Sequence, residues 1–320
     1  MSLDPAYLEY PMRRRGMDHD CYPYSNLFDR PALTWPSGKP VAAVVMVSLE
    51  WFPITPADKP FRAPGHMVTP YPDYRHYTSR EYGTRVGVYR MLDALEKAGV
   101  CASFAVNGAI ADRYPQLVAD VVAGGHEIVA HSTDMNGTIA SGMPAEDERA
   151  LIAGALASLE KATGTRPAGW MSIARSQSFD TPRYLVEAGI EYMCDWVNDD
   201  LPYRFATPAG SLINVPINHE LSDRQIITVQ QNSADSWAQQ MQDAYALLAA
   251  EASRFGGGRM LPLHVTPYIM GLPYRIGAFE ALLNDLAATP DCVFATAGQI
   301  AHAAHEALPA AATNGPSVPT

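Results

Sequence analysis

The sequence predicts an α/β fold in which a mostly parallel sheet closes into a β/α barrel of seven or eight units. Short apolar segments alternate with amphipathic helical segments along most of the chain, which is the pattern of repeated strand–helix units. This number of strands favours a closed barrel over an open sheet. No Gly-x-Gly-x-x-Gly motif follows a predicted strand, so the sequence does not indicate a nucleotide-binding fold.

The first predicted strand is the best defined element. Residues 41–48 form a continuous apolar run without alternation, which indicates a strand buried on both faces. A helix follows, with apolar residues at helical spacing from Val88 to Leu95 and Gly99 at its end. Further strands are predicted over 101–106, 127–130, 169–173, 191–195, 211–215, 226–230, 260–264 and 293–296. Further helices are predicted over 114–124, 146–162, 181–188, 235–254, 275–288 and 298–306.

The chain is predicted to hold one barrel domain with irregular segments at both ends. Residues 1–40 are rich in Pro, Tyr and Arg and show no sustained period, so we expect an irregular N-terminal arm. The barrel domain is predicted over 41–306, and a disordered tail over 307–320. Residues 51–80 contain many prolines and aromatic residues, which predicts a long loop of the kind that forms a lid or a binding loop.

Composition limits the classes of partner. The chain of 320 residues has 23 Lys and Arg against 34 Asp and Glu, a net charge of −11, so nucleic acid and membranes are not expected as main partners. The first ten residues do not resemble a signal peptide, and no apolar run approaches the roughly 18 residues of a membrane span. The four cysteines are scattered. We therefore expect reduced thiols in a cytoplasmic protein that acts on a small molecule.

Polar residues follow the predicted strands. In a β/α barrel the chemistry gathers at the carboxyl ends of the strands, so side chains that follow different strands are expected to meet at one rim. The residues in these positions are Glu50, Asn107, His131, Ser132, Asp134, Arg175, Asp195, Asn198, Asp199, Asp200 and His264. We interpret this convergence as a candidate site.

Each of these residues also has a purely structural interpretation. Glu50 could be a charge paired with a barrel arginine, and His131 could be a buried histidine whose hydrogen bonds are satisfied. Arg175 could form a structural salt bridge, and Asp199 and Asp200 could cap a turn. Ser132 lacks a Gly-x-Ser-x-Gly motif, so a serine hydrolase is not indicated.

Several motifs resemble the polysaccharide deacetylase superfamily, in particular the branch of cofactor-independent allantoinases and cyclic imide hydrolases. The resemblance covers roughly residues 40–305 and implies a distorted (β/α)7-8 barrel of the polysaccharide deacetylase type. Together with the arm it implies a homo-oligomer, either a dimer or a tetramer. The motifs that carry it are Tyr82-Gly-x-Arg85-x-Gly87, Ala102–Val106, Gly124–His131, Gly169-Trp170, Leu185–Gly189, Asn198–Tyr203, and Leu263-His264 followed by Gly271-x-Pro-x-Arg275.

The resemblance also implies that most of the metal ligands of that superfamily are missing. Metal-dependent members carry Thr-Phe-Asp-Asp after the first strand, and the matching stretch is Ser48-Leu-Glu50-Trp51. Glu50 keeps the position of the general base, whereas Trp51 replaces a metal ligand. The His-Ser/Thr-x-x-His motif becomes His131-Ser-Thr-Asp-Met135, so a second ligand is lost. By the same resemblance Arg175 is the motif arginine, and His264 is the general acid.

These implications predict hydrolytic ring opening of a small cyclic amide, imide or ureide by metal-independent acid–base catalysis. Without a metal to activate water and polarise the carbonyl, an electrophilic ring carbonyl is favoured over an acetylated sugar. Glu50 is expected to activate water, His131 and Arg175 to hold the oxyanion, and His264 to protonate the leaving nitrogen. Substrate-binding roles are predicted for Trp51, Asn107, Trp170, Asp199 and Asp200.

Two alternatives remain open at this point. One is a metal-dependent N-deacetylase of an acetylated sugar or amide, in which Glu50, His131 and either Asp134 or Asn136 hold a divalent ion such as zinc. The other is a family member that binds a ligand without catalysis.

Overall fold

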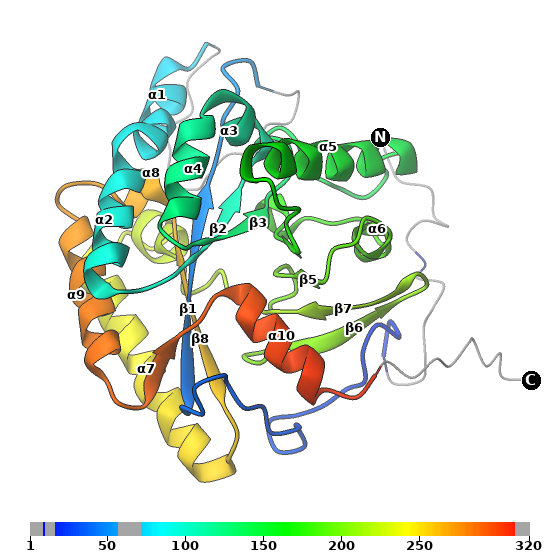
Figure 1. Ribbon diagram of the computed structural model, residues 1–320, viewed down its shortest axis with the longest axis vertical. Helices are drawn as coiled ribbons and strands as arrows, with labels where there is room; N and C mark the ends of the chain where they lie inside the picture. Colours follow the sequence, from blue (N-terminus) through cyan, green and yellow to red (C-terminus); the bar gives the residue numbers. More distant parts are fainter. Residues whose placement is uncertain (1–8, 10–16, 57–71, 311–320) are drawn as a thin grey trace, which may run out of the picture.

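The computed structural model describes residue 9 and residues 17–56 and 72–310. Predictions for 1–8, 10–16, 57–71 and 311–320 lie outside the described residues. A curled sheet forms the centre of the molecule, and helices cover its convex side (Figure 1). Its strands are β1 (Val41–Leu49), β2 (Ser103–Val106), β3 (Glu127–Ala130), β4 (Gly169–Trp170), β5 (Tyr192–Met193), β6 (Tyr203–Thr207), β7 (Gly210–Asn214), β8 (Arg259–Val265) and β9 (Cys292–Phe294).

The sheet is a curled half-barrel. Its strand order is β6-β7-β5-β4-β3-β2-β1-β8, and β9 pairs with the first residues of β1. All pairs are parallel except β6 with β7, which form an antiparallel hairpin. The predicted α/β fold of the distorted-barrel type is confirmed. In the described part of the chain, β6 and β8 end the path of paired strands, so the sheet curls without closing into the full ring that the strand count favoured.

The helices predicted from apolar periodicity all have counterparts in the structure. The α-helices are α1 (Tyr74–Tyr82), α2 (Val88–Ala98), α3 (Gly108–Arg113), α4 (Pro115–Ala123), α5 (Ala145–Thr163), α6 (Thr181–Glu187), α7 (Ala234–Phe255), α8 (Pro267–Met270), α9 (Ile276–Ala288) and α10 (Ala297–Ala307). Two π-helices, η2 (Gly83–Gly87) and η4 (Arg224–Val229), and one 3₁₀ helix, η3 (Ile173–Arg175), complete the set. Since α10 extends to Ala307, the predicted tail boundary falls at the last helical residue.

The strand predicted over 226–230 is wrong. Its β-branched residues favour a strand on propensity, yet residues 226–229 are helical and belong to η4, and Gln230 is its C-cap. The hydroxyl of Ser222 accepts a hydrogen bond from the backbone N–H of Gln225, and the neighbouring Asp223 accepts the backbone N–H of Thr266. These tertiary anchors override the local propensity and place Arg224 at the start of a π-helix, a form frequent at functional sites.

The loop predicted over 51–80 contains the start of a helix. Asp73 caps α1 by accepting a hydrogen bond from the backbone N–H of His76, which stabilises the first turn. The helix was missed because the sequence of α1 is polar and lacks an apolar stripe. Strand β6 was missed too, because it lies in the hairpin that precedes the predicted strand over 211–215.

The alternation of β1 separates two apolar cores. Odd-numbered residues such as Val45 and Val47 pack under the outer helices. Even-numbered residues such as Val44 and Met46 face the concave side, which α10 and Trp35 help to fill. Because successive side chains of a strand point to opposite faces, Ser48 continues the concave row above this inner core. The polar residues at the carboxyl ends of the strands therefore lie next to this buried apolar core.

Helix α8 lies in close contact with η2. A Cβ atom on Gly87 would come within 2.1 Å of the carbonyl oxygen of Pro267, a separation that no side chain tolerates. Glycine at this position lets the two backbones approach each other. This contact fixes Tyr268, the second residue of α8, at the carboxyl end of the barrel.

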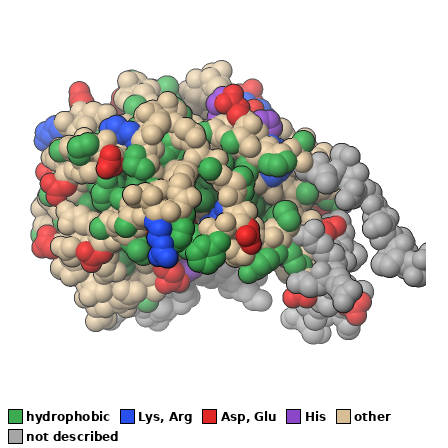
Figure 2. All heavy atoms as spheres, turned by 90° about the horizontal axis from the view of Figure 1, so that it is seen from below, with side chains coloured by type: hydrophobic (Ala, Val, Ile, Leu, Met, Phe, Trp, Pro, Cys, Tyr) green, Lys and Arg blue, Asp and Glu red, His purple; other side chains and the backbone are tan. Residues whose placement is uncertain are grey.

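Figure 2 shows the end of the barrel at which the parallel strands begin, opposite to their carboxyl ends. Acidic and basic side chains are interspersed there among apolar ones, so the net negative charge is not gathered into one block on this face. Within the described residues no helix combines the length and the apolar character needed to cross a membrane.

Candidate active site

The register of the strands sets the level of the candidate site. Glu50, Asn107 and His131 directly follow the last residues of β1, β2 and β3, and those last residues are paired neighbours in the sheet. His264 lies near the carboxyl end of β8, which runs parallel to β1. Because the carboxyl ends of parallel strands meet at one edge, these four residues belong to a common rim.

Glu50 is held by two donors. One oxygen of its buried carboxylate accepts a hydrogen bond of 2.6 Å from Nη2 of Arg224, and the other accepts one of 2.8 Å from the hydroxyl of Tyr268. The same Nη2 also donates to the Tyr268 hydroxyl at 2.8 Å. Burial works against the charge of Arg224, but Glu50 and Tyr268 more than offset this and raise its pKa. The side chains thus form a charge-assisted clamp with one ion pair at its centre.

His131 is a neutral imidazole whose hydrogen-bonding roles are fixed. Its Nδ1 donates to the carbonyl oxygen of Met171 at 2.5 Å, so the lone pair lies on Nε2. Burial lowers the pKa of His131 to about 4, although Glu50 acts in the opposite direction. An unprotonated Nε2 accepts hydrogen bonds and cannot donate one. The oxyanion-holding role expected for His131 is therefore not the role that this arrangement favours.

His264 contacts Ser48 and Arg175. Nη2 of Arg175 approaches Nδ1 of His264 at 3.4 Å, and Nε2 lies 2.7 Å from the hydroxyl of Ser48. Since a guanidinium can only donate, Nδ1 is the acceptor and Nε2 carries the hydrogen. Burial and the charges of Arg175 and Arg224 lower the pKa of His264 well below its usual value. This imidazole is neutral at neutral pH, which weakens the general-acid role that the family resemblance implied.

Arg175 is presented by a strained turn. Both Ala174 and Arg175 have positive φ angles, 54° and 58°, a region that non-glycine residues rarely adopt and that is enriched at functional sites. Nη2 of Arg175 also donates to the carbonyl oxygen of Ile217 at 2.8 Å. Buried Asp195 accepts from the backbone N–H and the hydroxyl of Ser172 just before this turn. Asp195 therefore supports the turn that directs Arg175 toward His264.

Arg224 and Tyr268 were not recognised in the sequence. Arg224 precedes a β-branched stretch that resembles a strand, and Tyr268 lies four residues beyond His264, on α8. The signal that could have located Arg224 is the dipeptide Asp223-Arg224. Asp223 accepts the backbone N–H and the hydroxyl of Thr266, directly after β8, and this ties η4 to the rim.

Asp223 predicts a pH dependence of stability. Burial raises its pKa to about 7, against about 3.9 in an unfolded chain. Because the folded-state pKa is raised, this group stabilises the fold fully below about pH 4, and its contribution is lost as the pH rises through about 7. We expect the free energy of unfolding of the wild type, relative to Asp223→Asn, to fall by up to roughly 4 kcal/mol over this range. Urea unfolding of both proteins between pH 4 and 8 measures this difference, and parallel curves would contradict it.

Two of the predicted substrate-binding residues, Asn107 and Trp51, contact other parts of the protein. The side-chain oxygen of Asn107 accepts from the backbone N–H of Trp51 at 2.8 Å, and its amide nitrogen donates to the carbonyl oxygen of His131. Asn107 thus joins the ends of three strands. The ring of Trp51 packs on Tyr114 and lies 4.6 Å from the guanidinium carbon of Arg113. It belongs to the packing beneath the outer helices rather than to the Glu50 cluster.

The other predicted substrate-binding residues are Trp170, Asp199 and Asp200. Trp170 is fully buried in the outer core and donates to the hydroxyl of Ser172 at 2.8 Å. Asp199 pairs with Arg30 of the N-terminal segment, and Asp200 is exposed. The pair of Asp199 with Arg30 attaches that segment to the barrel, which is a structural function.

The residues proposed for a metal do not form a site that suits one. In the part of the chain that the structure describes, no three His, Cys, Asp or Glu side chains come together as a set of ligands. Both oxygens of Glu50 already accept hydrogen bonds, one of them from a guanidinium cation. Asp134 accepts the backbone N–H of Asn136, and Met135 replaces the second histidine. The positive charge next to the Glu50 carboxylate is the guanidinium of Arg224, whose Nη2 lies 2.6 Å from one carboxylate oxygen.

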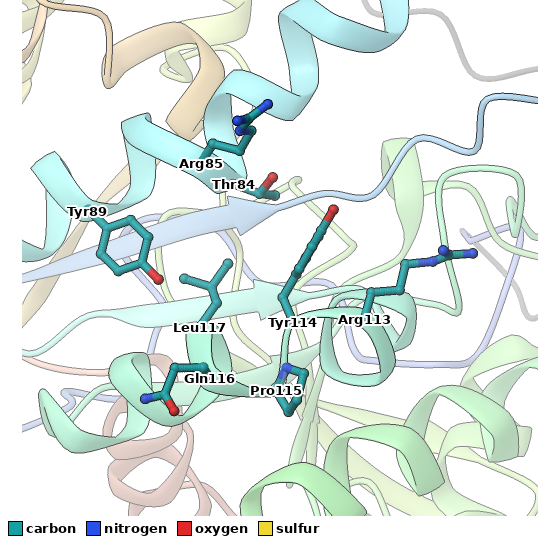
Figure 3. Close-up of a pocket in the computed structure, with 8 residues that line it drawn as sticks. All are labelled: Thr84, Arg85, Tyr89, Arg113, Tyr114, Pro115, Gln116 and Leu117. Carbon is teal, nitrogen blue, oxygen red and sulfur yellow. The ribbon is translucent and has the colours of Figure 1, made fainter.

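A separate pocket lies on the outer side of the barrel. It has a volume of about 450 Å³ and lies where η2 and α2 face the junction of α3 and α4 (Figure 3). Arg85 and Tyr89 line one side, and Arg113 and Tyr114 line the other. Trp51 packs on the latter two residues. The pocket thus contains none of the side chains that surround Glu50.

Comparisons with known proteins agree with this architecture. Residues 77–193 match the sequence model of the family described as polysaccharide deacetylase. A putative polysaccharide deacetylase of Schizosaccharomyces pombe is 24% identical over 239 residues, covering 70% of this chain and 74% of that protein.

Solved structures with similar folds include a probable polysaccharide deacetylase from Pseudomonas aeruginosa PAO1 and PuuE allantoinase. Each has a TM-score of 0.78 and 24% identity, and each match covers 89% of this chain and 98% of the other. A putative polysaccharide deacetylase from Mycobacterium smegmatis has a TM-score of 0.71 and 23% identity, with coverage of 90% and 98%. Residues 77–193 are thus similar in sequence to the polysaccharide deacetylase family, and the chain as a whole shares the fold of these solved structures.

Proposed function

We propose that the protein hydrolyses carbon–nitrogen bonds other than peptide bonds, and that it opens the ring of a small cyclic amide, imide or ureide without a resident metal. One observation carries the proposal. The carboxylate of Glu50 is buried between Arg224 and Tyr268 and lies within electrostatic reach of the neutral imidazole of His131. A carboxylate and an unprotonated imidazole nitrogen are the groups that orient and deprotonate a water molecule.

Glu50 is the general base in this proposal. Each carboxylate oxygen can accept more than one hydrogen bond, so the clamp by Arg224 and Tyr268 leaves room for water. Nε2 of His131 accepts the second hydrogen bond of that water and directs its oxygen toward the carbonyl carbon. The clamp gives the buried side chain two hydrogen-bond donors, one of them a guanidinium cation, and holds it in position to take the proton.

Arg175 is the donor that stabilises the oxyanion. Its guanidinium is a fixed positive charge in a largely buried site, where a preorganised donor stabilises developing negative charge most strongly. His264 orients this guanidinium by accepting a hydrogen bond on Nδ1. We therefore assign His264 a positioning role. The proton that Glu50 takes from water is then returned by Glu50 to the leaving nitrogen, so that water adds across the bond.

The substrate class follows from the strength of this machinery. General acid–base catalysis contributes about 10²–10⁴-fold, and one oxyanion donor about 10²–10³-fold. These factors suit an imide or ureide carbonyl, whose nitrogen leaves readily, better than an unactivated acetamide. The fold shared with PuuE allantoinase supports the same class.

The test is turnover by protein treated with a chelator. Succinimide, hydantoin, dihydrouracil, allantoin and an oligomer of N-acetylglucosamine are offered in parallel, and product carboxylate or acetate is measured. We expect ring opening that survives chelation, together with substoichiometric metal by elemental analysis. Activity that is lost on chelation and restored by zinc, or that is confined to the acetylated sugar, would refute the proposal.

A further inference from the structure

Arg80 is a buried cation beside the site that the proposed mechanism does not use. The residue lies on α1 and is 2% exposed. Nη1 donates to the carbonyl oxygen of His76 at 3.0 Å and to the hydroxyl of Ser79 at 3.1 Å, both in the same helix. Nε and Nη2 are buried and have no hydrogen-bond partner among the residues that the structure describes. Two of the three nitrogens of this guanidinium, which carry three of its five N–H donors, therefore lack an acceptor among the described residues.

The position of Arg80 connects it to the site. Its guanidinium carbon lies 5.0 Å from the ring centre of Phe52 and 5.5 Å from that of Tyr268. Tyr268 in turn donates to Glu50. Burial lowers the pKa of Arg80, while Tyr268 and Glu50 act in the opposite direction. Since an arginine stays protonated in proteins, the site holds a permanent positive charge one aromatic ring away from the general base.

The partners of the three arginines differ in kind. Arg224 donates to the carboxylate of Glu50. Arg175 donates to a carbonyl oxygen and an imidazole, and Arg80 donates to a carbonyl oxygen and a hydroxyl. Two of the three buried guanidinium groups therefore have no carboxylate among these hydrogen-bond partners. A buried charge without a counter-ion is unfavourable, and a bound anion would relieve this.

The donors of Arg80 that lack partners form one edge of its guanidinium. The hydrogens of Nε and Nη2 point in the same direction, and this pair binds a carboxylate through two parallel hydrogen bonds. The rings of Phe52 and Tyr268 wall the guanidinium and would pack on a flat ring. The chemistry recognised here is a planar ring that bears an anionic group.

We propose that the substrate of this site is a cyclic amide, imide or ureide that carries a carboxylate, and that Arg80 binds this carboxylate. The inference rests on the proposed ring-opening function and narrows its substrate class. Arg80 then determines specificity, whereas Glu50 and Arg175 act at the scissile bond.

Two pairs of rings test the inference. Hydantoin is compared with hydantoin-5-acetate, and dihydrouracil with dihydroorotate, because the members of each pair differ in the carboxylate. We expect the wild type to favour the charged member by about 10²-fold in kcat/KM. Arg80→Met should remove this preference, mostly through KM, while the neutral rings stay within about threefold of wild type. Arg80→Lys should keep part of the preference, and Arg85→Met, a nearby exposed arginine, should leave it unchanged.

The outcomes separate this inference from the function on which it rests. A wild type that cleaves both members of each pair equally well overturns the carboxylate inference alone, and this readout requires no folded variant. Equal losses on charged and neutral rings in Arg80→Met, with a shifted pH profile, would overturn it as well, because Arg80 would then act through Glu50. A wild type that cleaves no ring at all refutes the proposed function itself.

Discussion

Replacing Glu50 with glutamine is expected to lower kcat by about 10³-fold, while KM changes little. Glutamine keeps the size and the acceptor oxygen of the side chain but cannot take a proton from water. Loss of a general base removes about 10²–10⁴-fold of rate, and here the same group also returns the proton to nitrogen. Steady-state kinetics on the best ring substrate of the panel measure the effect. A variant within tenfold of wild type would exclude Glu50 as the base.

The matched control is Glu127→Gln. Glu127 begins β3, at the opposite end of the barrel, and accepts hydrogen bonds from Tyr192, Ser103 and the backbone of Gly298. It is likewise a carboxylate with several hydrogen-bond donors, so this substitution tests the effect of losing a charge without touching the site. We expect kcat to remain within about threefold of wild type, as is usual for a residue that does not contact the substrate.

The rim of the barrel could be predicted from the sequence because it depends on local rules. The apolar run before Glu50 and the shorter strand before His131 are recognisable segment by segment. Their neighbouring positions then follow from the geometry of parallel strands. His264 is recognisable in the same way from the strand that ends beside it. For these residues, knowing which strand they follow or end is enough to place them at the carboxyl end of the barrel.

The partners of those residues could not be predicted, because they depend on tertiary contacts. Arg224 lies on a π-helix whose β-branched sequence resembles a strand, and Arg80 lies on a helix without an apolar stripe. The roles of His131 and His264 depend on Met171 and Arg175, whose positions no spacing rule gives. A sequence can therefore locate an imidazole at a rim without indicating which nitrogen carries its proton.

Asn107 and Trp170 show that a position at the rim does not by itself indicate which partner a side chain has. Both follow or end a strand at the correct level, so position favoured contact with a substrate. The side chain of Asn107 forms hydrogen bonds with the backbone of Trp51 and with that of His131. Trp170 packs in the outer core. A polar residue at a rim is as well suited to joining the strand ends as to binding a ligand, because the backbone groups exposed there also need partners.

Replacing Arg224 with methionine is expected to abolish activity and to lower the free energy of unfolding by about 3–5 kcal/mol. The pair of Arg224 with Glu50 is nearly buried, with side-chain exposures of 18% and 2%. Removing one member leaves the other as an uncompensated buried charge, which costs about that amount. Glu50 would also lose the donor that holds its carboxylate in position, so the proposed base would no longer be oriented toward water. Urea unfolding and steady-state kinetics measure the two effects.

The double variant Glu50→Gln with Arg224→Met distinguishes a lost charge partner from general damage to the site. If the cost of Arg224→Met comes from an unpaired carboxylate, neutralising Glu50 should recover most of the lost stability but none of the activity. Arg149→Met is the matched control, because its pair with Glu187 is exposed and such pairs contribute about 0–1 kcal/mol. A double variant as unstable as the sum of the two single variants would mean that Arg224 stabilises the fold by packing, and the ion pair with Glu50 would not account for its effect.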